Sequence, residues 1–462
     1  MSAPTKHRSA EEIGRTALGP RPFPELGGQR AAADLDTVDT TLANGLRVIA
    51  VRRSSVPLVE VRLRIPFGDP ASSSTGSTHA ARAELLASTV LTGTATRSRV
   101  DVDTELALVG GELDAAVDPE RLAFTGNALA AGLDTVLDVL RDALTGATYP
   151  NEEVERERAR LVERIRLARS QPSVIAREAL QRHLYGDHPY AKEMPEADEV
   201  LSVTRDDVLA LHAAAVLPRG AVLVLVGDVA PDAAVRAVEN ALGGWTAEGT
   251  AVTLSPLPVV RGGDVLLVHR PGAVQSQIRL AARALVRTDE RYPALQLANL
   301  VYGGFFSSRL VENIREDKGY TYHARSYPEF TPGGAALLVD ADTASEVTAS
   351  ALLETRYELA RMALSPPSEE EVGTACRYAV GSLLTATSSQ GGLASFLVNL
   401  AGLGLGVDWF LGHPGRLAAV TVEQVAEVAL EFFAPTAFTG VLVGDADKLT
   451  PRLRALGGVA LP

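Results

Sequence analysis

Two stretches of the chain end alike: Ala221-Val222-Leu223-Val224-Leu225-Val226-Gly227-Asp228 and Phe438-Thr439-Gly440-Val441-Leu442-Val443-Gly444-Asp445. Each is typical of a short buried strand, because its run of apolar, mostly β-branched residues has no polar face and stops at a Gly-Asp pair. The shared ending Leu-Val-Gly-Asp closes each half of the sequence. We therefore expect two copies of one structural unit.

Working outward from these strands, the same alternation of strands and helices occurs in both halves and predicts an α+β fold. The segment 58–65 alternates apolar and polar residues, as a half-buried strand does. The further expected strands are 46–51, 265–269 and 275–282, and the expected helices are 80–91, 154–169, 204–215, 291–301 and a helix ending at Leu242.

Composition divides the chain into four parts. Residues 1–35 are rich in Pro, Gly and Arg without periodicity, and we expect a flexible arm there. Residues 246–263 interrupt the pattern with Gly, Thr, Ser and Pro, which is typical of a linker. The linker separates an N-terminal domain at 36–245 from a C-terminal domain at 264–462.

Charge and cysteine content narrow the possible partners and the compartment. A net charge of −13 argues against nucleic acid as a partner, because a phosphate backbone is bound by a basic face. No stretch has the roughly 18 unbroken apolar residues of a membrane span, and the first 28 residues do not resemble a secretory signal. Cys376 is the only cysteine, which excludes an internal disulfide and suits a reducing compartment. We expect a cytoplasmic protein without a membrane partner.

Several short motifs occur in an order and at spacings that together indicate a protein family. They are Asn44-Gly45-Leu46-Arg47-Val48, Thr92-Gly93-Thr94, Tyr149-Pro150-Asn151-Glu152-Glu153, Gly186-Asp187-His188-Pro189-Tyr190, Ser307-Ser308-Arg309-Leu310 and Ile314-Arg315-Glu316-Asp317-Lys318-Gly319-Tyr320-Thr321-Tyr322. With these, residues 38–450 resemble the insulinase–pitrilysin metallopeptidases, in the branch that includes mitochondrial processing peptidase. The resemblance implies two homologous halves, each a mostly antiparallel sheet backed by helices.

The family's catalytic zinc motif, His-x-x-Glu-His with a distal Glu, has no counterpart in this chain. The resemblance aligns Glu84 with the first His, Ala87 with the general base, Ser88 with the second His and Arg164 with the distal Glu. The absence does not depend on that alignment, because no two of the eight histidines lie four residues apart; they are His7, His79, His183, His188, His212, His269, His323 and His413. We expect no zinc and no other cofactor in this chain.

A second part of the family's site is present. Active members carry an Arg and a Tyr seven residues apart that hold the substrate, and Arg315 and Tyr322 keep that spacing. The residues by themselves leave a structural alternative open, in which Arg315 pairs with Glu312 or Glu316 and Tyr322 is a core aromatic. Tyr320 and Tyr322 are expected on one face of a strand that follows a helix ended by Gly319.

A chain without the zinc half of the site but with the substrate half resembles the non-catalytic member of a two-chain peptidase. The resemblance therefore implies a heterodimer with a homologous zinc-bearing subunit and a peptide substrate, with no peptidase activity in this chain alone. Two alternatives stay open: a structural scaffold subunit, like the peptidase-derived core subunits of respiratory complexes, and a homodimeric peptide-binding protein without chemistry.

Overall fold

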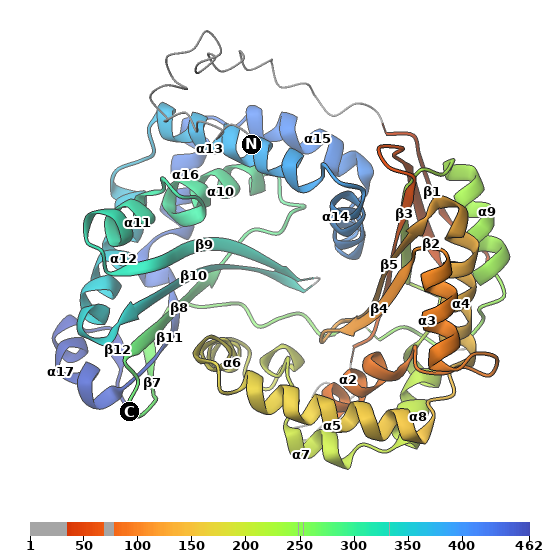
Figure 1. Cartoon of the computed structure of the whole chain (residues 1–462). Coiled ribbons are helices and arrows are strands. Elements are labelled where there is room, and N and C mark those ends of the chain that lie inside the picture. The colour runs from red at the N-terminus through yellow and green to blue at the C-terminus, as the bar shows by residue number, and fades with distance from the viewer. Residues whose placement is uncertain (1–34, 69–77, 248, 253, 332) are drawn as a thin grey trace, which may run out of the picture. The chain divides into compact units, whose positions relative to one another are not determined.

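A computed structural model describes residues 35–68, 78–247, 249–252, 254–331 and 333–462 (Figure 1). Residues Leu35–Pro462 form one compact unit. The arm predicted at 1–35 lies, apart from its last residue, outside the described residues.

The compact unit contains two sheets of six strands each. The first has the order β1-β2-β6-β3-β5-β4 and the second β12-β7-β11-β8-β10-β9. The strands of the first sheet are β1 (Thr37–Thr41), β2 (Arg47–Arg52), β3 (Leu58–Pro66), β4 (Glu112–Val117), β5 (Arg121–Leu129) and β6 (Val222–Gly227). Those of the second are β7 (Val265–His269), β8 (Gln275–Arg283), β9 (Thr321–Thr331), β10 (Gly334–Ala344), β11 (Thr439–Gly444) and β12 (Val459–Ala460).

The two Gly-ending strands occupy the same place in both sheets. β6 runs parallel to β2 and antiparallel to β3, and β11 runs parallel to β7 and antiparallel to β8. The remaining pairs are antiparallel except β12 with β7. All six residues of β6 and of β11 are buried, as expected for strands covered on both faces. The predicted α+β fold of two homologous, mostly antiparallel halves is confirmed.

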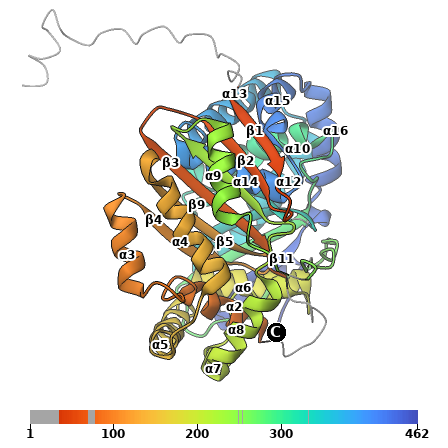
Figure 2. The same cartoon turned by 90° about the vertical axis from the view of Figure 1, so that its right-hand side faces the viewer.

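Helices supply the second layer. The α-helices of the first half are α2 (His79–Thr89), α3 (Arg99–Leu108), α4 (Leu133–Gly146), α5 (Asn151–Ala168), α6 (Pro172–Tyr185), α7 (Ala197–Ser202), α8 (Arg205–Ala215) and α9 (Pro231–Leu242). Those of the second half are α10 (Tyr292–Asn299), α11 (Arg309–Val311), α12 (Thr348–Leu364), α13 (Glu369–Ala386), α14 (Gln390–Gly402), α15 (Val407–Ala418), α16 (Val422–Phe432) and α17 (Ala446–Leu456). Two π-helical segments, η3 (Leu300–Gly304) and η4 (Glu312–Asp317), flank α11, and short 3₁₀ turns lie at Ala130–Gly132, Pro189–Ala191, Ser345–Val347 and Pro435–Ala437. Figure 2 shows α4 and α9 over the strands of the first sheet.

One helix from each half packs on the sheet of the other half. α14 packs on β3 and β6, where Leu393 and Leu397 meet Val224. Likewise, α6 of the first half packs on β8 and β11 of the second sheet (Figure 1). Leu180 and Val441 belong to the same buried cluster there. Burying apolar side chains in this way gives roughly 1.5–3 kcal/mol for each fully buried Leu or Val. The exchange of helices ties the two sheets together.

The connection between the halves has no regular structure in its described part. Residues 249–252 and 254–264 form neither helix nor strand. Val260 is buried with the α6 cluster. The domain boundaries drawn from composition stay a prediction.

Among the described residues, no single helix is long and apolar enough to cross a membrane. The helices α14 and α15, bent by 98° from each other, reach that length and composition only as a pair.

Candidate functional site

The four positions that align with the family's zinc site come from two packed helices. Glu84, Ala87 and Ser88 lie on α2, whose Leu85, Leu86 and Ala87 are buried in the hydrophobic core of the first half. α5 packs against α2, and Nη2 of Arg164 lies 3.2 Å from Oε2 of Glu84, across 80 positions of sequence. The two ends of the predicted site therefore do meet, through an ion pair.

These side chains do not fit a zinc ion. Zinc in peptidases is held by imidazole nitrogens and carboxylates, with one position open for water. Ala87 has no donor atom, and the Ser88 hydroxyl donates to the carbonyl oxygens of Glu84 at 2.9 Å and Leu85 at 3.1 Å. Arg164 is a permanent cation that repels a metal. Burial raises the pKa of Glu84, and the nearby Arg164 charge lowers it in part. The guanidinium of Arg164 thus lies at a position that the resemblance assigns to a zinc ligand.

Two cavities flank this ion pair. One of about 440 Å³ is lined by Ala87, Ser88 and Arg164, and by charged residues of α3 and α5. The other, of about 550 Å³, is lined by Glu84 and α6 on one side and by the second sheet on the other. The second sheet contributes Arg279, Arg325, Tyr327, Leu338 and Asp340.

Asp340 organises the second-sheet wall of the larger cavity. Its Oδ2 accepts from Nη2 of Arg325 at 3.0 Å and from the Tyr327 hydroxyl at 3.2 Å. Its Oδ1 lies 3.7 Å from Nε of Arg279. Burial, followed by the Asp340 charge, raises the pKa of Tyr327 to about 12. Sequence reasoning missed this group, because the residues sit on three strands and only the register of the sheet brings them together.

Arg315 and Tyr322 are also neighbours. Arg315 lies in η4, which is followed by Gly319 with the left-handed φ of +61° expected of a helix-ending glycine. The guanidinium carbon of Arg315 lies 5.2 Å from the centre of the Tyr322 ring and 4.2 Å from that of Phe306. The arginine is thus in contact with two aromatic rings, and Phe306 was not expected from the sequence. No sequence motif links a phenylalanine to an arginine at this separation, so Phe306 could not be identified before the structure was known.

Tyr322 is 87% exposed, so the alternative that it is a core aromatic is wrong. The expected shared face of Tyr320 and Tyr322 is also wrong. Tyr320 precedes β9 and packs against the hydrophobic core of the second half, whereas Tyr322 is the second residue of β9. The pairing of β9 with β10 shifts register between Ala341 and Thr343, and this irregularity breaks the simple alternation.

The Arg315 side chain makes few polar contacts. Within the described residues no hydrogen bond joins its guanidinium to another group, and its ion pair with Glu316 is 3.5 Å long. The structure brings each half of the predicted site together separately, and the described residues that line the cavity beside Glu84 do not include Arg315 or Tyr322.

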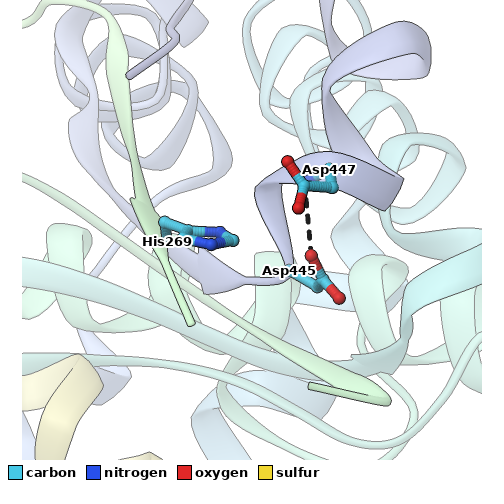
Figure 3. Close-up of side chains that lie close together, drawn as sticks. All are labelled: His269, Asp445 and Asp447. Carbon is cyan, nitrogen blue, oxygen red and sulfur yellow. Dashed lines mark hydrogen bonds between the residues drawn. The ribbon is translucent and has the colours of Figure 1, made fainter. Parts of the chain in front are cut away.

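One further cluster has the composition of a metal site. In the described part of the chain, His269, Asp445 and Asp447 place their ligand atoms within 4.8 Å of one another (Figure 3). Nδ1 of His269 accepts from the Ala446 N–H at 3.0 Å. Asp445 accepts from the N–H groups of Asp447 at 3.2 Å and of Gly272 at 3.1 Å. These contacts are those of an N-cap on α17, and they account for the cluster.

Cys376, the single cysteine, lies half-buried in α13 against the hydrophobic core of the second half. Burial raises the pKa of its thiol, which disfavours the reactive thiolate.

Comparison with protein families matches both halves of the chain. Residues 48–198 match Insulinase (Peptidase family M16), and residues 202–378 match Peptidase M16 inactive domain. Among curated proteins, an uncharacterized zinc protease of Streptomyces coelicolor is 27% identical over 426 residues, which cover 90% of this chain and 91% of the relative. An uncharacterized zinc protease of Mycobacterium tuberculosis is 28% identical over 433 residues, covering 92% and 98%.

Solved structures share the fold. A peptidase M16 inactive domain from Pseudomonas fluorescens superposes with a TM-score of 0.80 at 20% identity, covering 88% of this chain and 98% of that one. A protease from Helicobacter pylori gives 0.80 at 18%, covering 88% and 99%. The periplasmic protease PqqL from Escherichia coli gives 0.74 at 17% identity, covering 96% and 48%. With both family matches and the repeated two-sheet architecture, the chain belongs to the insulinase-like M16 peptidase family.

Proposed function

We propose that this chain is the non-catalytic, substrate-holding subunit of a heterodimeric zinc peptidase, and that a homologous subunit supplies the zinc. The substrate is a peptide, which the pair degrades or processes. The observation that carries the proposal is the contact of Arg315 with the exposed ring of Tyr322, in a chain where the Glu84–Arg164 ion pair lies at the positions aligned with the family's zinc site. We further propose a cytoplasmic location, because a single cysteine suits a reducing compartment.

The exposure of Tyr322 and the few polar contacts of Arg315 support a role toward another chain. Tyr322 is 87% exposed, and the polar contact of the Arg315 guanidinium within the described residues is the 3.5 Å ion pair of Nε with Glu316. A guanidinium has five N–H donors, so the Nη groups of Arg315 are available to a ligand. The pair also lies outside the cavity beside Glu84. Both facts suit residues that complete a site on a partner subunit.

The chemistry of the pair suits a peptide. The Arg315 edge can donate to the carbonyl oxygens of an extended peptide, as charge-assisted hydrogen bonds. The Tyr322 hydroxyl can donate to the carbonyl that becomes an oxyanion when the partner's site attacks it. This chain performs neither the attack nor proton abstraction, because position 87 is an alanine and the Glu84 carboxylate is paired with Arg164.

The test is co-expression with a zinc-bearing M16 relative from the same genome. We expect a complex with one copy of each chain, zinc in the relative alone, and hydrolysis of a quenched fluorescent peptide library only by the mixture. Tyr322→Phe in the complex should lower kcat by about 10²- to 10³-fold, the usual cost of one oxyanion donor. Arg315→Ala should lower kcat/KM by about ten- to 150-fold, the loss of one charged hydrogen-bonding contact.

Tyr320→Phe is the matched control, because that tyrosine packs against the core and should change activity little. Full activity of the zinc-bearing relative by itself would contradict the proposed division of labour. Wild-type turnover by both site variants, in complexes that still assemble, would favour a scaffold role. Self-association without any partner would favour a homodimeric peptide-binding protein.

A further inference from the structure

We propose that Phe306 is a positioning residue: it holds the Arg315 guanidinium flat against Tyr322, so that the N–H edges of the arginine point to a bound peptide. The geometry rests on the described residues alone, and the identity of the ligand rests on the proposed function. Phe306 thus deepens that function as a residue that neither the family's zinc motif nor its Arg–Tyr pair includes.

Phe306 is turned outward by the local backbone. The preceding Phe305 has an extended conformation, with φ −149° and ψ 175°, directly after the π-helical segment η3. Consecutive side chains of an extended chain point in opposite directions. Phe305 accordingly packs toward the core and stacks on Tyr378 with ring centres 5.1 Å apart, whereas Phe306 is 60% exposed. The exposed ring is not needed for the core.

The outward ring is in contact with the guanidinium of Arg315, at 4.2 Å. Tyr322 contacts the same guanidinium at 5.2 Å. A guanidinium that stacks on rings uses its faces and leaves its in-plane N–H donors free. Contact with two rings therefore orients the arginine without consuming the donors that would bind a peptide carbonyl or a carboxylate.

Arg309, six positions earlier, shows what a structural arginine looks like in the same segment. It is 7% exposed, donates Nε and Nη2 to the two oxygens of Glu371 at 2.6 and 2.9 Å, and donates Nη1 to the Ser365 carbonyl at 2.8 Å. Its donors are used up within the chain. Arg315 differs from it: Nε of Arg315 makes a 3.5 Å ion pair with Glu316, and the guanidinium otherwise contacts the two aromatic rings.

The first measurement needs no partner. Arginine Nε–Hε groups are labelled with ¹⁵N in the full chain, the Arg315 signal is assigned with Arg315→Lys, and its relaxation is measured. We expect an ordered Arg315 Nε in the wild type and in Phe306→Tyr, and a mobile one in Phe306→Ala. Tyr357→Ala, at an exposed aromatic of α12 outside the stack, is the control and should leave the Arg315 signal ordered. An Arg315 side chain equally ordered in Phe306→Ala would overturn the proposal.

The second measurement is a double-mutant cycle in the complex with the zinc-bearing relative, using the peptide that the complex cleaves. An exposed cation–π contact predicts that Phe306→Ala raises KM by about two- to fivefold, with kcat changed less. The effect should disappear in an Arg315→Ala background, because Phe306 acts through the arginine. An effect that persists in that background would mean that Phe306 touches the peptide directly, and would overturn the positioning role.

The two failures are distinguishable. If Arg315→Ala leaves activity unchanged, the proposed function fails, while the relaxation data still report whether Phe306 orders Arg315. If Arg315→Ala abolishes binding but Phe306→Ala changes neither relaxation nor KM, the proposed function stands and the inference about Phe306 fails.

Discussion

Replacing Arg164 by Gln tests the Glu84–Arg164 ion pair, which lies at the positions aligned with the family's zinc site. The pair joins α2 to α5 with an N–O distance of 3.2 Å. Gln keeps most of the length of the side chain while removing its charge. The change therefore leaves the Glu84 carboxylate without its counter-ion and keeps the packing of the two helices.

The expected coupling free energy between Glu84 and Arg164 follows from how exposed the two side chains are. At 3.2 Å two unit charges attract by about 1.3 kcal/mol in water and about 5 kcal/mol at an effective dielectric constant of 20. The Arg164 side chain is 65% exposed and that of Glu84 is 26% exposed, which places the pair near the aqueous limit. Exposed pairs measured by double-mutant cycles are worth about 0.2–1 kcal/mol. We expect a coupling free energy of about 0.5–1 kcal/mol between the two residues at neutral pH.

The pH dependence has a definite sign. Burial raises the pKa of Glu84 above its ordinary value, so its ionised form is less favourable in the folded state than in the unfolded state. Losing Arg164 raises this pKa further. The destabilisation by Arg164→Gln is thus fully present at neutral pH, where the carboxylate is charged. It disappears as the pH falls below the ordinary pKa of a glutamate, where Glu84 is protonated in both states.

The assay is denaturant unfolding of the wild type, Arg164→Gln, Glu84→Gln and the double variant at neutral pH and at about pH 4, near the ordinary pKa of a glutamate. The double variant should be no less stable than Arg164→Gln, because an uncharged glutamine at position 84 has no buried charge to compensate. A coupling energy that is zero, or that is as large in acid as at neutral pH, would refute the reasoning that the Arg164 charge stabilises the Glu84 carboxylate in the folded state.

Three other sets of substitutions test the remaining sites. Placing the family's zinc-site residues at the four aligned positions should create a zinc site, because α2 and α5 already bring these positions together. The changes are Glu84→His, Ala87→Glu, Ser88→His and Arg164→Glu. At free zinc about 100-fold above its Kd the unfolding free energy of this variant should rise by about 2.7 kcal/mol, with no response in the wild type. Burial and the charges of nearby arginines lower the pKa of His413 to about 3. Because the unfolded chain binds a proton there that the folded chain does not, the free energy of unfolding should fall by about 2 kcal/mol between about pH 7 and pH 5. His413→Gln should flatten this slope in denaturant titrations. The Arg309 guanidinium lowers the pKa of Glu371 to about 2. Glu371→Ala leaves the buried Arg309 without its carboxylate, so the free energy of unfolding, measured with denaturant, should fall by about 3–5 kcal/mol at neutral pH. The loss should become smaller as the pH approaches the pKa of Glu371.

The sequence alone determined the features that depend on local pattern. The matching Gly-Asp endings predicted strands in equivalent places, and β6 and β11 do occupy the same position in the two sheets. The spacing of polar and apolar residues predicted α2 and α5 to within a few residues. Gly319 predicted the end of its helix, because an αL residue without a Cβ penalty is a local requirement. The missing histidine pair was equally certain, since a residue that is not in the chain cannot bind a metal.

Only the tertiary structure decided which of these groups face one another. The Glu84–Arg164 ion pair joins residues that are 80 positions apart, and the wall around Asp340 requires the register of three strands. The register shift in β9 turned Tyr322 outward and left Tyr320 against the core, where simple alternation placed both on one face. Phe306 met Arg315 because an extended residue after η3 reverses the side-chain direction. Such contacts depend on how separate helices and strands pack. The free energy of packing depends on both surfaces in contact, so it cannot be predicted from the local sequence of either segment.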